Sequence, residues 1–313
     1  AAAAGGREFG FFEFALAGVP LVLLTVAVVV LGGGVIGVEF ASVFNSFGAA
    51  VTIVEALPRL VAAEDEAISK QLERSFKKRK ITAKTGVKFA GAQGTDTGVT
   101  VSLESGETIE ADLLLVAVGR GPVTDGLGYE EAGVNVDRGF VLADERCRTN
   151  VASVRAVGDI VPGLQLAHRG FAQGIFVAED IAGLEPAPIV ESGIPRVTYC
   201  DPEIASVGLG TDAAKGAGHD VETVTYPLGG NGRSIIRGTS GSVTLVRAKD
   251  GPVLGVHMVG LGVSELISEA QLAVGWQAHP EDMAPLVHAH PSQGEAFGEA
   301  AMLAAGRPLH AHA

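Results

Sequence analysis

The pattern of apolar positions in the first part of the chain predicts alternating buried strands and helices. Residues 26–31 form a short β-branched run that ends in glycine, which is typical of a buried parallel strand. Residues 35–47 then have helical character up to Gly48, and residues 51–54 form a second β-branched run. Strand, helix and strand in this order predict a βαβ unit.

Two further patterns extend this α/β region. Residues 64–80 predict an amphipathic helix, because apolar side chains recur every four residues between charged ones. Alternation on either side of the Ser105-Gly106 pair predicts a β-hairpin, and residues 112–118 favour another buried strand. The apolar stripe of the helix consists of Ile68, Leu72 and Phe76.

The second half of the chain has a mixed pattern, which predicts an α+β region after residue 190. The expected strands lie within residues 150–159, 196–207 and 239–257, and the expected helices span residues 168–184, 264–276 and 294–305. Composition changes at residues 119–122 and again after Pro188, which divides the chain into residues 26–120, 121–190 and 191–313.

Residues 1–25 are assigned to no domain. The first six residues are of low complexity and residues 15–31 are almost wholly apolar, so a membrane span or a signal peptide is an alternative for this leader. The run is short for a span, and the strand expected at residues 26–31 accounts for its second half.

Composition and charge exclude several classes of function. The formal net charge of −13 argues against binding to nucleic acid or to anionic membrane surfaces. The two cysteines, Cys147 and Cys200, form no disulfide framework, so a reducing cytoplasm is expected. The spacing of histidines and cysteines predicts no metal site.

A glycine fingerprint, G-x-G-x-x-G, follows the first strand at Gly32, Gly34 and Gly37. Between a strand and a helix, it predicts that a dinucleotide pyrophosphate binds at the helix N-terminus. Glu55 ends the next strand, where a carboxylate accepts the ribose 2′-hydroxyl and repels a 2′-phosphate. We therefore predict NAD rather than NADP, with Arg59 as the nearest arginine that could favour the phosphate. The alternatives are a turn that only joins strand to helix and a solvated glutamate.

Several ordered motifs resemble the pyridine nucleotide–disulfide oxidoreductase family. They are residues 28–42 (VVVLGGGVIGVEFAS), 113–120 (LLLVAVGR), 156–159 (AVGD), 165–168 (QLAH) and 199–208 (YCDPEIASVG). Residues 288–299 (HAHPSQGEAFGE) resemble, within that family, the dihydrolipoamide dehydrogenases. By this resemblance, Gly119 in the second motif would contact NAD.

The resemblance implies a flavoprotein that oxidises dihydrolipoamide through a protein disulfide and FAD and then passes a hydride to NAD⁺. It implies a Rossmann-like NAD-binding domain at residues 26–120, the return segment of an FAD domain at residues 121–190, and a dimerisation (interface) domain at residues 191–313. It also implies a homodimer that acts on dihydrolipoamide or on the lipoyl domain of a 2-oxo acid dehydrogenase complex.

The same resemblance implies roles for residues that bind FAD. Asp159, after Gly158, would hold the ribityl chain, and Ala167 and His168 would begin a helix whose N–H groups face the flavin. Glu39 would lie near the flavin and pair with a lysine outside the matched residues. Taken alone, the Gly-Asp pair is more typical of a turn than of a flavin site. For Glu39, the alternative is an acidic residue in the first turn of a helix.

His290 and Glu295 resemble the catalytic pair of the family. His290 would be the base that takes a proton from the substrate dithiol, and Glu295 would orient and polarise its imidazole. As an alternative, the spacing from Ser292 to Glu295 is that of a capping box, in which Glu295 caps a helix. The two roles are compatible.

The sequence departs from the family pattern in its first thirty residues, which contain neither the family's first G-x-G-x-x-G nor its C-x₄-C disulfide. Cys147 and Cys200 match other family segments and are expected to be buried, inert thiols. We therefore expect an N-terminally truncated chain with little activity alone. The alternatives are a thiol-independent FAD/NAD(P) reductase or transhydrogenase, and a non-catalytic module for NAD binding and dimerisation.

Overall fold

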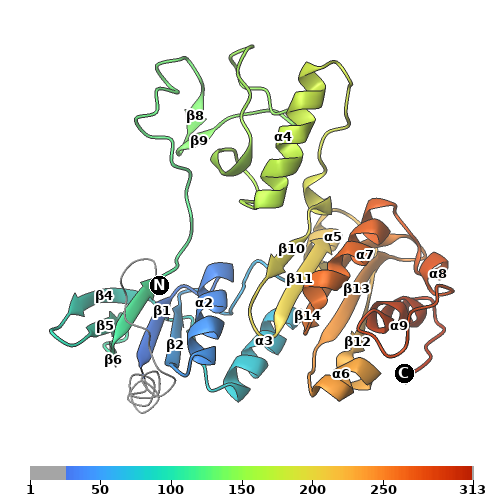
Figure 1. Cartoon of the computed structure of the whole chain (residues 1–313), viewed down its shortest axis with the longest axis horizontal. Coiled ribbons are helices and arrows are strands. Elements are labelled where there is room, and N and C mark those ends of the chain that lie inside the picture. Colours follow the sequence, from blue (N-terminus) through green and yellow to red (C-terminus); the bar gives the residue numbers. More distant parts are fainter. Residues whose placement is uncertain (1–25, 312–313) are drawn as a thin grey trace, which may run out of the picture. The chain divides into compact units, whose positions relative to one another are not determined.

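The structure, a computed structural model, describes residues 26–311 (Figure 1). The leader expected at residues 1–25 lies outside the described residues. Contacts divide the chain into two compact units. The first contains residues 26–118 together with Thr198–Ile204, and the second contains Gly119–Val197 and residues 205–311. Within residues 26–311, none of the helices has the length and apolar character needed to cross a membrane.

A parallel sheet with the strand order β3-β2-β1-β7 forms the centre of the first unit. Its strands are β1 (Ala27–Leu31), β2 (Ala50–Glu55), β3 (Thr82–Thr85) and β7 (Leu113–Val116), and helices α2 (Val35–Ser46) and α3 (Glu66–Lys78) follow β1 and β2 along the chain. Val28, Val29 and Val30 are at most 2% exposed, as expected for the inner strand of such a sheet. The βαβ unit and the Rossmann-like fold are confirmed.

Helix α3 confirms the amphipathic pattern. Its N-cap is Asp65, whose side chain accepts a hydrogen bond from the N–H of Ala67 at 3.1 Å. The stripe of Ile68, Leu72 and Phe76 is buried. The helix is two residues shorter at each end than the predicted 64–80, because capping rather than apolar spacing decides where it starts.

A three-stranded antiparallel sheet lies between β3 and β7 in sequence and consists of β4 (Phe89–Gly94), β5 (Val99–Leu103) and β6 (Thr108–Ala111). The predicted hairpin is confirmed, with Gly106 at a φ of +87° in its turn. Val101 and Leu103 pack in one cluster with Val29 and Val54, which joins the two sheets of this unit.

The second unit begins with a segment of little regular structure around one helix. Its elements are β8 (Val136–Asp137), β9 (Phe140–Val141), the 3₁₀ turns η2 (Gly158–Ile160) and η3 (Glu191–Gly193), and helix α4 (Ala167–Ile181). The strand expected within residues 150–159 is wrong, since only an isolated bridge forms there. The Thr149 hydroxyl binds the carbonyls of Val151 and Val154, and Asn150 binds the backbone of Asn135, so polar side chains replace strand pairing.

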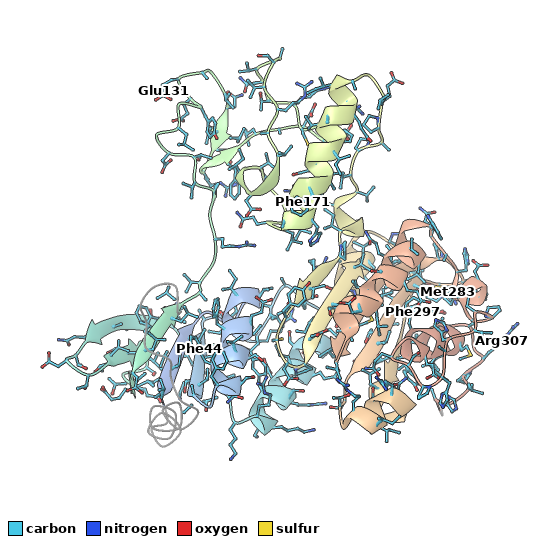
Figure 2. The ribbon with its side chains drawn as sticks, in the orientation of Figure 1. Phe44, Glu131, Phe171, Met283, Phe297 and Arg307 are labelled. Carbon is cyan, nitrogen blue, oxygen red and sulfur yellow. The ribbon has the colours of Figure 1, made fainter. Side chains whose placement is uncertain are left out.

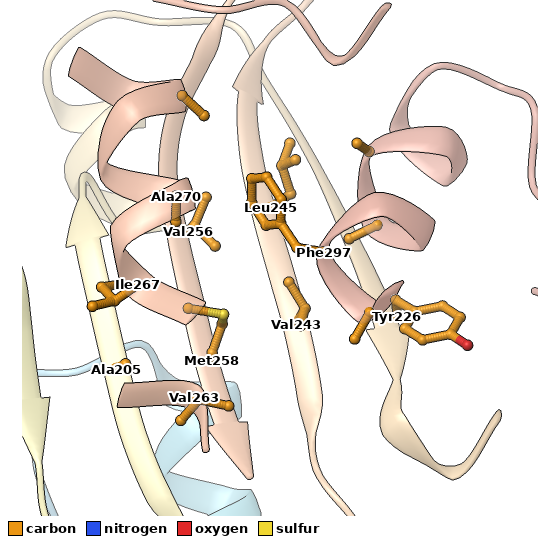
Figure 3. Close-up of a cluster of buried hydrophobic side chains, with 14 of the residues drawn as sticks. Ala205, Tyr226, Val243, Leu245, Val256, Met258, Val263, Ile267, Ala270 and Phe297 are labelled. Carbon is orange, nitrogen blue, oxygen red and sulfur yellow. The ribbon is translucent and has the colours of Figure 1, made fainter. Parts of the chain in front are cut away.

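A five-stranded sheet with the order β10-β11-β14-β13-β12 forms the rest of this unit. Its strands are β10 (Arg196–Thr198), β11 (Glu203–Gly208), β12 (Val221–Pro227), β13 (Ser242–Ala248) and β14 (Val253–Gly260), and its helices are α5 (Thr211–Gly216), α6 (Gly232–Arg237), α7 (Val263–Gly275), α8 (Pro280–Met283) and α9 (Glu295–Ala304), with a 3₁₀ turn η4 (Leu228–Gly230). Ile267 of α7 and Phe297 of α9 pack against the strands in one core cluster (Figure 3). Met283, labelled in Figure 2, belongs to the same cluster. The α+β region is confirmed.

Candidate functional site

Two glycines of the fingerprint are needed for the fold, because a side chain at either position would collide with the backbone. Gly32 has a φ of +107°, and a Cβ there would collide with the carbonyl oxygen of Ala117. A Cβ on Gly37 would collide with the carbonyl oxygen of Gly32. These two positions fix the turn between β1 and α2 and the close approach of the helix to it.

Gly34 differs from both. It is the N-cap of α2 with an ordinary φ of −73°, and no heavy atom of the described residues lies within 4 Å of a Cβ built there. No described side chain caps the helix at this end. The first N–H groups of α2 have no partner within the helix and no described side chain caps them, which is the arrangement that binds a phosphate.

The carboxylate of Glu55 is held beside this turn. It accepts hydrogen bonds from the N–H of Gly33 at 2.5 Å and from the N–H of Leu57 at 2.7 Å. A Cβ on Gly33 would lie 2.6 Å from Leu60 Cδ2 and 3.0 Å from Glu55 Cβ. Sequence reasoning assigned no role to Gly33, although the run of three glycines was a signal that the middle one also packs closely.

Arg59 is the arginine that could favour a 2′-phosphate, and its guanidinium is already engaged. Nη1 donates to the carbonyl of Glu64 at 2.7 Å and to Ser69 Oγ at 2.9 Å, and Nη2 donates to the carbonyl of Ala62 at 2.8 Å. These bonds fix the loop after β2 and occupy three of the five N–H donors of the guanidinium.

Glu39 is the fifth residue of α2, so its interpretation as an acidic residue of the first helical turn is wrong. Its carboxylate accepts a hydrogen bond from the N–H of Tyr199 at 2.7 Å. Next to it, Ser42 Oγ accepts from the N–H of Asp201 at 2.9 Å, and Arg79 donates to the Asp201 carbonyl at 2.7 Å. Sequence reasoning missed Ser42 and Arg79, which hold this segment on α2.

Gly119 follows β7 by three residues and has a φ of +146°. As at Gly34, no heavy atom within residues 26–311 lies within 4 Å of a Cβ built there. Its backbone conformation accounts for glycine at this position, because side chains of L-residues rarely adopt it.

Gly158 and Asp159 lie in the turn η2. Gly158 has a φ of +78°, and its N–H donates to Gln173 Oε1 at 2.7 Å. The Asp159 carboxylate is half exposed and lies 3.9 Å from Nη1 of Arg120. A buried arginine, Arg169, supports the turn through bonds to the carbonyls of Pro162 and Gly158 and to Glu191. Neither Gln173 nor Arg169 could be predicted from the amino-acid pattern, because these two polar residues of helix α4 are buried while the apolar Phe171, labelled in Figure 2, is exposed.

Ala167 and His168 are the first two residues of α4, and no described side chain caps this helix. His168 Nε2 lies 2.8 Å from the carbonyl oxygen of Pro195, which fixes the imidazole and leaves the N-terminal N–H groups of the helix free.

His290 and Glu295 are in contact. His290 Nδ1 lies 2.8 Å from Glu295 Oε1, and the imidazole is 74% exposed. The second carboxylate oxygen accepts from the N–H of Ser292 at 2.8 Å. Half of the capping box therefore forms, but the N-cap of α9 is Gly294 and Glu295 is the first residue of the helix.

The environment of Glu295 favours its charged form. Burial would raise the pKa of this carboxyl, but the hydrogen bond from Ser292 N–H and the contact with His290 outweigh it, so its pKa lies below the ordinary value. Residues that sequence reasoning missed support this loop. Asn231, which is buried, donates to the Ser292 carbonyl at 2.9 Å, and His288 Nε2 lies 2.8 Å from Glu269 Oε1.

The two thiols are buried, as expected. Burial raises the pKa of Cys147, and burial together with the neighbouring Glu39 raises the pKa of Cys200 to about 12. Both are therefore poor nucleophiles at neutral pH. In the part of the chain that the structure describes, no three histidine, cysteine or acidic side chains are grouped as metal ligands.

Comparison with known proteins gives two family matches. The family described as pyridine nucleotide-disulphide oxidoreductase matches residues 13–174, and its dimerisation domain matches residues 194–301. The first match includes residues 13–25, which sequence analysis left unassigned.

Curated relatives and solved structures agree with these matches. The chain is similar to dihydrolipoyl dehydrogenases of Bacillus subtilis (38% identity, covering 91% of this chain and 61% of the relative) and Chlorobaculum parvum (41%, covering 89% and 61%). Among solved structures, LpdA from Mycobacterium tuberculosis has a TM-score of 0.83 at 28% identity, covering 88% of this chain and 61% of that one. The HOCl-induced flavoprotein disulfide reductase RclA from Escherichia coli has a TM-score of 0.81 at 26% identity, covering 88% and 64%. The chain thus spans about three fifths of the length of the curated relatives it matches.

Proposed function

This chain belongs to the pyridine nucleotide-disulphide oxidoreductase family, and we propose that it carries the NAD-binding and dimerisation parts of a dihydrolipoyl dehydrogenase. Such an enzyme converts dihydrolipoamide and NAD⁺ to lipoamide, NADH and a proton. The similarity to dihydrolipoyl dehydrogenases over about nine tenths of the chain supports this proposal. Within the proposal, the chain forms a homodimer in the cytoplasm and acts on dihydrolipoamide or the lipoyl domain of a 2-oxo acid dehydrogenase complex.

The observation that carries the NAD site is the open space at Gly34. A side chain at position 34 would collide with nothing within residues 26–311, whereas side chains at Gly32 and Gly37 would collide with backbone oxygens. The close approach of a bound pyrophosphate best explains why position 34 is also glycine. The N-terminus of α2 would then hold the phosphates, and the fixed Glu55 carboxylate would accept the ribose 2′-hydroxyl. The engaged guanidinium of Arg59 supports NAD over NADP.

The residues of the second unit fit a flavin. Asp159 presents a half-exposed carboxylate that could accept from the ribityl hydroxyls, and Arg120 and Gly158 hold its turn. The N-terminus of α4 offers N–H groups at Ala167 and His168. When bound, FAD would carry the electron pair from a dithiol to NAD⁺.

His290 has the geometry of a proton acceptor. If Nδ1–H donates to Glu295, Nε2 is unprotonated and exposed to a substrate thiol. The ionised Glu295 would stabilise the imidazolium that forms when the thiol proton is transferred. In the forward direction the imidazolium then releases this proton to solvent, and it is the proton formed together with NADH. In the reverse direction the imidazolium returns a proton to the sulfur as lipoamide is reduced.

The thiols limit what these 313 residues do alone. Cys147 and Cys200 are the two cysteines of the sequence, both are buried, and neither is activated. We therefore propose that the 313 residues alone turn over dihydrolipoamide slowly or not at all. These buried thiols also favour a second candidate function, a non-catalytic module for NAD binding and dimerisation.

Three measurements on the purified chain test these proposals. Calorimetric titration should show binding of NAD⁺ and weaker binding of NADP⁺, and light scattering should give the mass of a dimer. The visible spectrum after addition of FAD should show a bound flavin. NAD binding without flavin would support the non-catalytic module, and absence of NAD binding would contradict both functions. Rapid formation of NADH from dihydrolipoamide and NAD⁺ would contradict the expected low activity.

A further inference from the structure

Helix α9 presents two carboxylates one turn apart, and each contacts a histidine. Glu295 and Glu299 are four residues apart and therefore lie on the same face of the helix. Glu295 contacts His290 Nδ1 at 2.8 Å, and Glu299 contacts His310 Nδ1 at 2.6 Å. The proposed function uses the first pair and leaves the second without a role.

Glu299 needs its partner because it is buried. Its side chain is 5% exposed, and a buried carboxylate is costly unless hydrogen bonds or a cation compensate it. His310 binds both oxygens, with Nδ1 on Oε1 and its backbone N–H 3.2 Å from Oε2. The tail that carries His310 turns back after α9 through the N–H of Arg307, labelled in Figure 2, which donates to the Met302 carbonyl at 2.8 Å.

The two pairs are close enough to interact. Tyr226 of β12 packs against α9, and its pKa is raised by burial and then by the charges of Glu299 and Glu295. The charge of His310 is among the effects that lower the pKa of Glu295, after burial, Ser292 N–H and His290. At the other end of α9, Arg247 is paired with Glu281 and binds the Ala304 carbonyl.

We propose that His310 is a positioning residue for the pair His290–Glu295. By compensating the buried Glu299, it keeps the charge of that carboxylate from acting on the neighbouring pair, in which the charged Glu295 is the acceptor for His290. This inference rests on the proposed function, in which His290 is the base. It predicts that the charges at positions 299 and 310 act on His290 in opposite directions.

The test is NMR titration of the histidine imidazoles in the full 313-residue chain, with the His290 signal assigned by His290→Gln. His310→Asn keeps a donor near the position of Nδ1 but removes the group that can compensate Glu299, so the uncompensated carboxylate should raise the pKa of His290 by roughly half a unit. Glu299→Gln removes the anion and should lower the pKa of His290. His219→Asn, at an exposed position after α5, is the matched control and should have no effect.

A double variant keeps the test decisive if His310→Asn alone folds poorly. Glu299→Gln with His310→Asn removes both charges and leaves no buried carboxylate unpaired, so the pKa of His290 should return to the wild-type value. A purely structural role would move the pKa in the same direction in both single variants, and that result would overturn the inference. So would a His310→Asn shift no larger than that of the control, or a double variant that does not return to the wild-type value.

This titration can refute the role of His310 without refuting the proposed function, and the reverse also holds. Opposite shifts in a chain that binds no NAD would refute the proposed function and leave the coupling of His310 to His290 in place. NAD binding and lipoamide chemistry in the complete enzyme, without the opposite shifts, would refute the coupling alone.

Discussion

Glu55 accepts a hydrogen bond from the backbone N–H of Gly33 at 2.5 Å, so the carboxylate that ends β2 is fixed against the turn that opens α2. The bond joins two elements 22 residues apart and holds the carboxylate before any ligand arrives. An acceptor that is already oriented loses little conformational freedom on binding, which favours affinity for a ribose hydroxyl.

Replacement of Glu55 tests this relationship. Glu55→Gln removes the charge at nearly constant shape, so the Kd for NAD⁺ should rise about tenfold, as expected for loss of a charged hydrogen bond. Because the repulsion of a 2′-phosphate is also lost, the preference for NAD⁺ over NADP⁺ should shrink. Calorimetric titration of both cofactors measures the two effects, with Glu104→Gln on the exposed β5–β6 turn as the control. An unchanged preference would contradict the role of Glu55.

Two glycines of the fingerprint allow a paired test that separates the effect of a methyl group on NAD⁺ binding from its effect on the stability of the fold. Gly34→Ala places a methyl group in open space at an ordinary φ, so the melting temperature should stay the same while NAD⁺ binding weakens at least about tenfold. Gly37→Ala drives a methyl group into the Gly32 carbonyl and should destabilise the fold by about 1–3 kcal/mol. Thermal unfolding and NAD⁺ titration of both variants separate the effects. If Gly34→Ala bound NAD⁺ normally, the open space would need another explanation.

The two buried thiols should not react with thiol reagents in the native chain. With a pKa of about 12, Cys200 is a thiolate in about one molecule in ten thousand at pH 8, and burial also protects Cys147. A chromogenic disulfide reagent should therefore react with neither thiol on the time scale of minutes, and with both after denaturation. Rapid labelling of the native chain, or an internal disulfide after mild oxidation, would show that the cysteines can take part in redox chemistry.

Much of the fold could be predicted from local patterns in the sequence, whereas much of the candidate site could not. The strands around Val29 and the stripe of Ile68, Leu72 and Phe76 were predictable because burial imposes a period on the sequence. The turn at residues 149–154 was not, because the side chain of Thr149 replaces strand pairing through bonds that leave no periodic signal. The start of α2 at Val35 was predicted correctly, but Glu39 was assigned to the first turn although it is the fifth residue of that helix and lies just beyond the turn.

The residues that support the candidate site could not be predicted from the sequence for a related reason. Gln173 and Arg169 bind Gly158 of η2 from helix α4, which is 15 and 11 residues further along the chain, and Arg79 holds Asp201 from 122 residues away. Contacts of this kind depend on how the elements pack, whereas the fingerprint glycines act within one turn. The histidine His310 is a similar case, since its partner becomes apparent only when the tail folds back on α9.

The depressed pKa of Glu295 makes a prediction about stability and pH. A carboxyl whose pKa is lower in the folded than in the unfolded chain stabilises the fold above its unfolded pKa, which is about 4.3, and this contribution is lost as the pH falls through the folded value. Glu295→Gln should therefore destabilise the chain by about 1 kcal/mol at pH 7, as for one hydrogen bond, and by less below pH 4. Urea unfolding of wild type and variant between pH 3.5 and 7 measures the difference, with Glu104→Gln as the control. A difference that grew as the pH fell would mean that Glu295 is better accommodated as the neutral acid, and its assignment as the charged partner of His290 would have to be withdrawn.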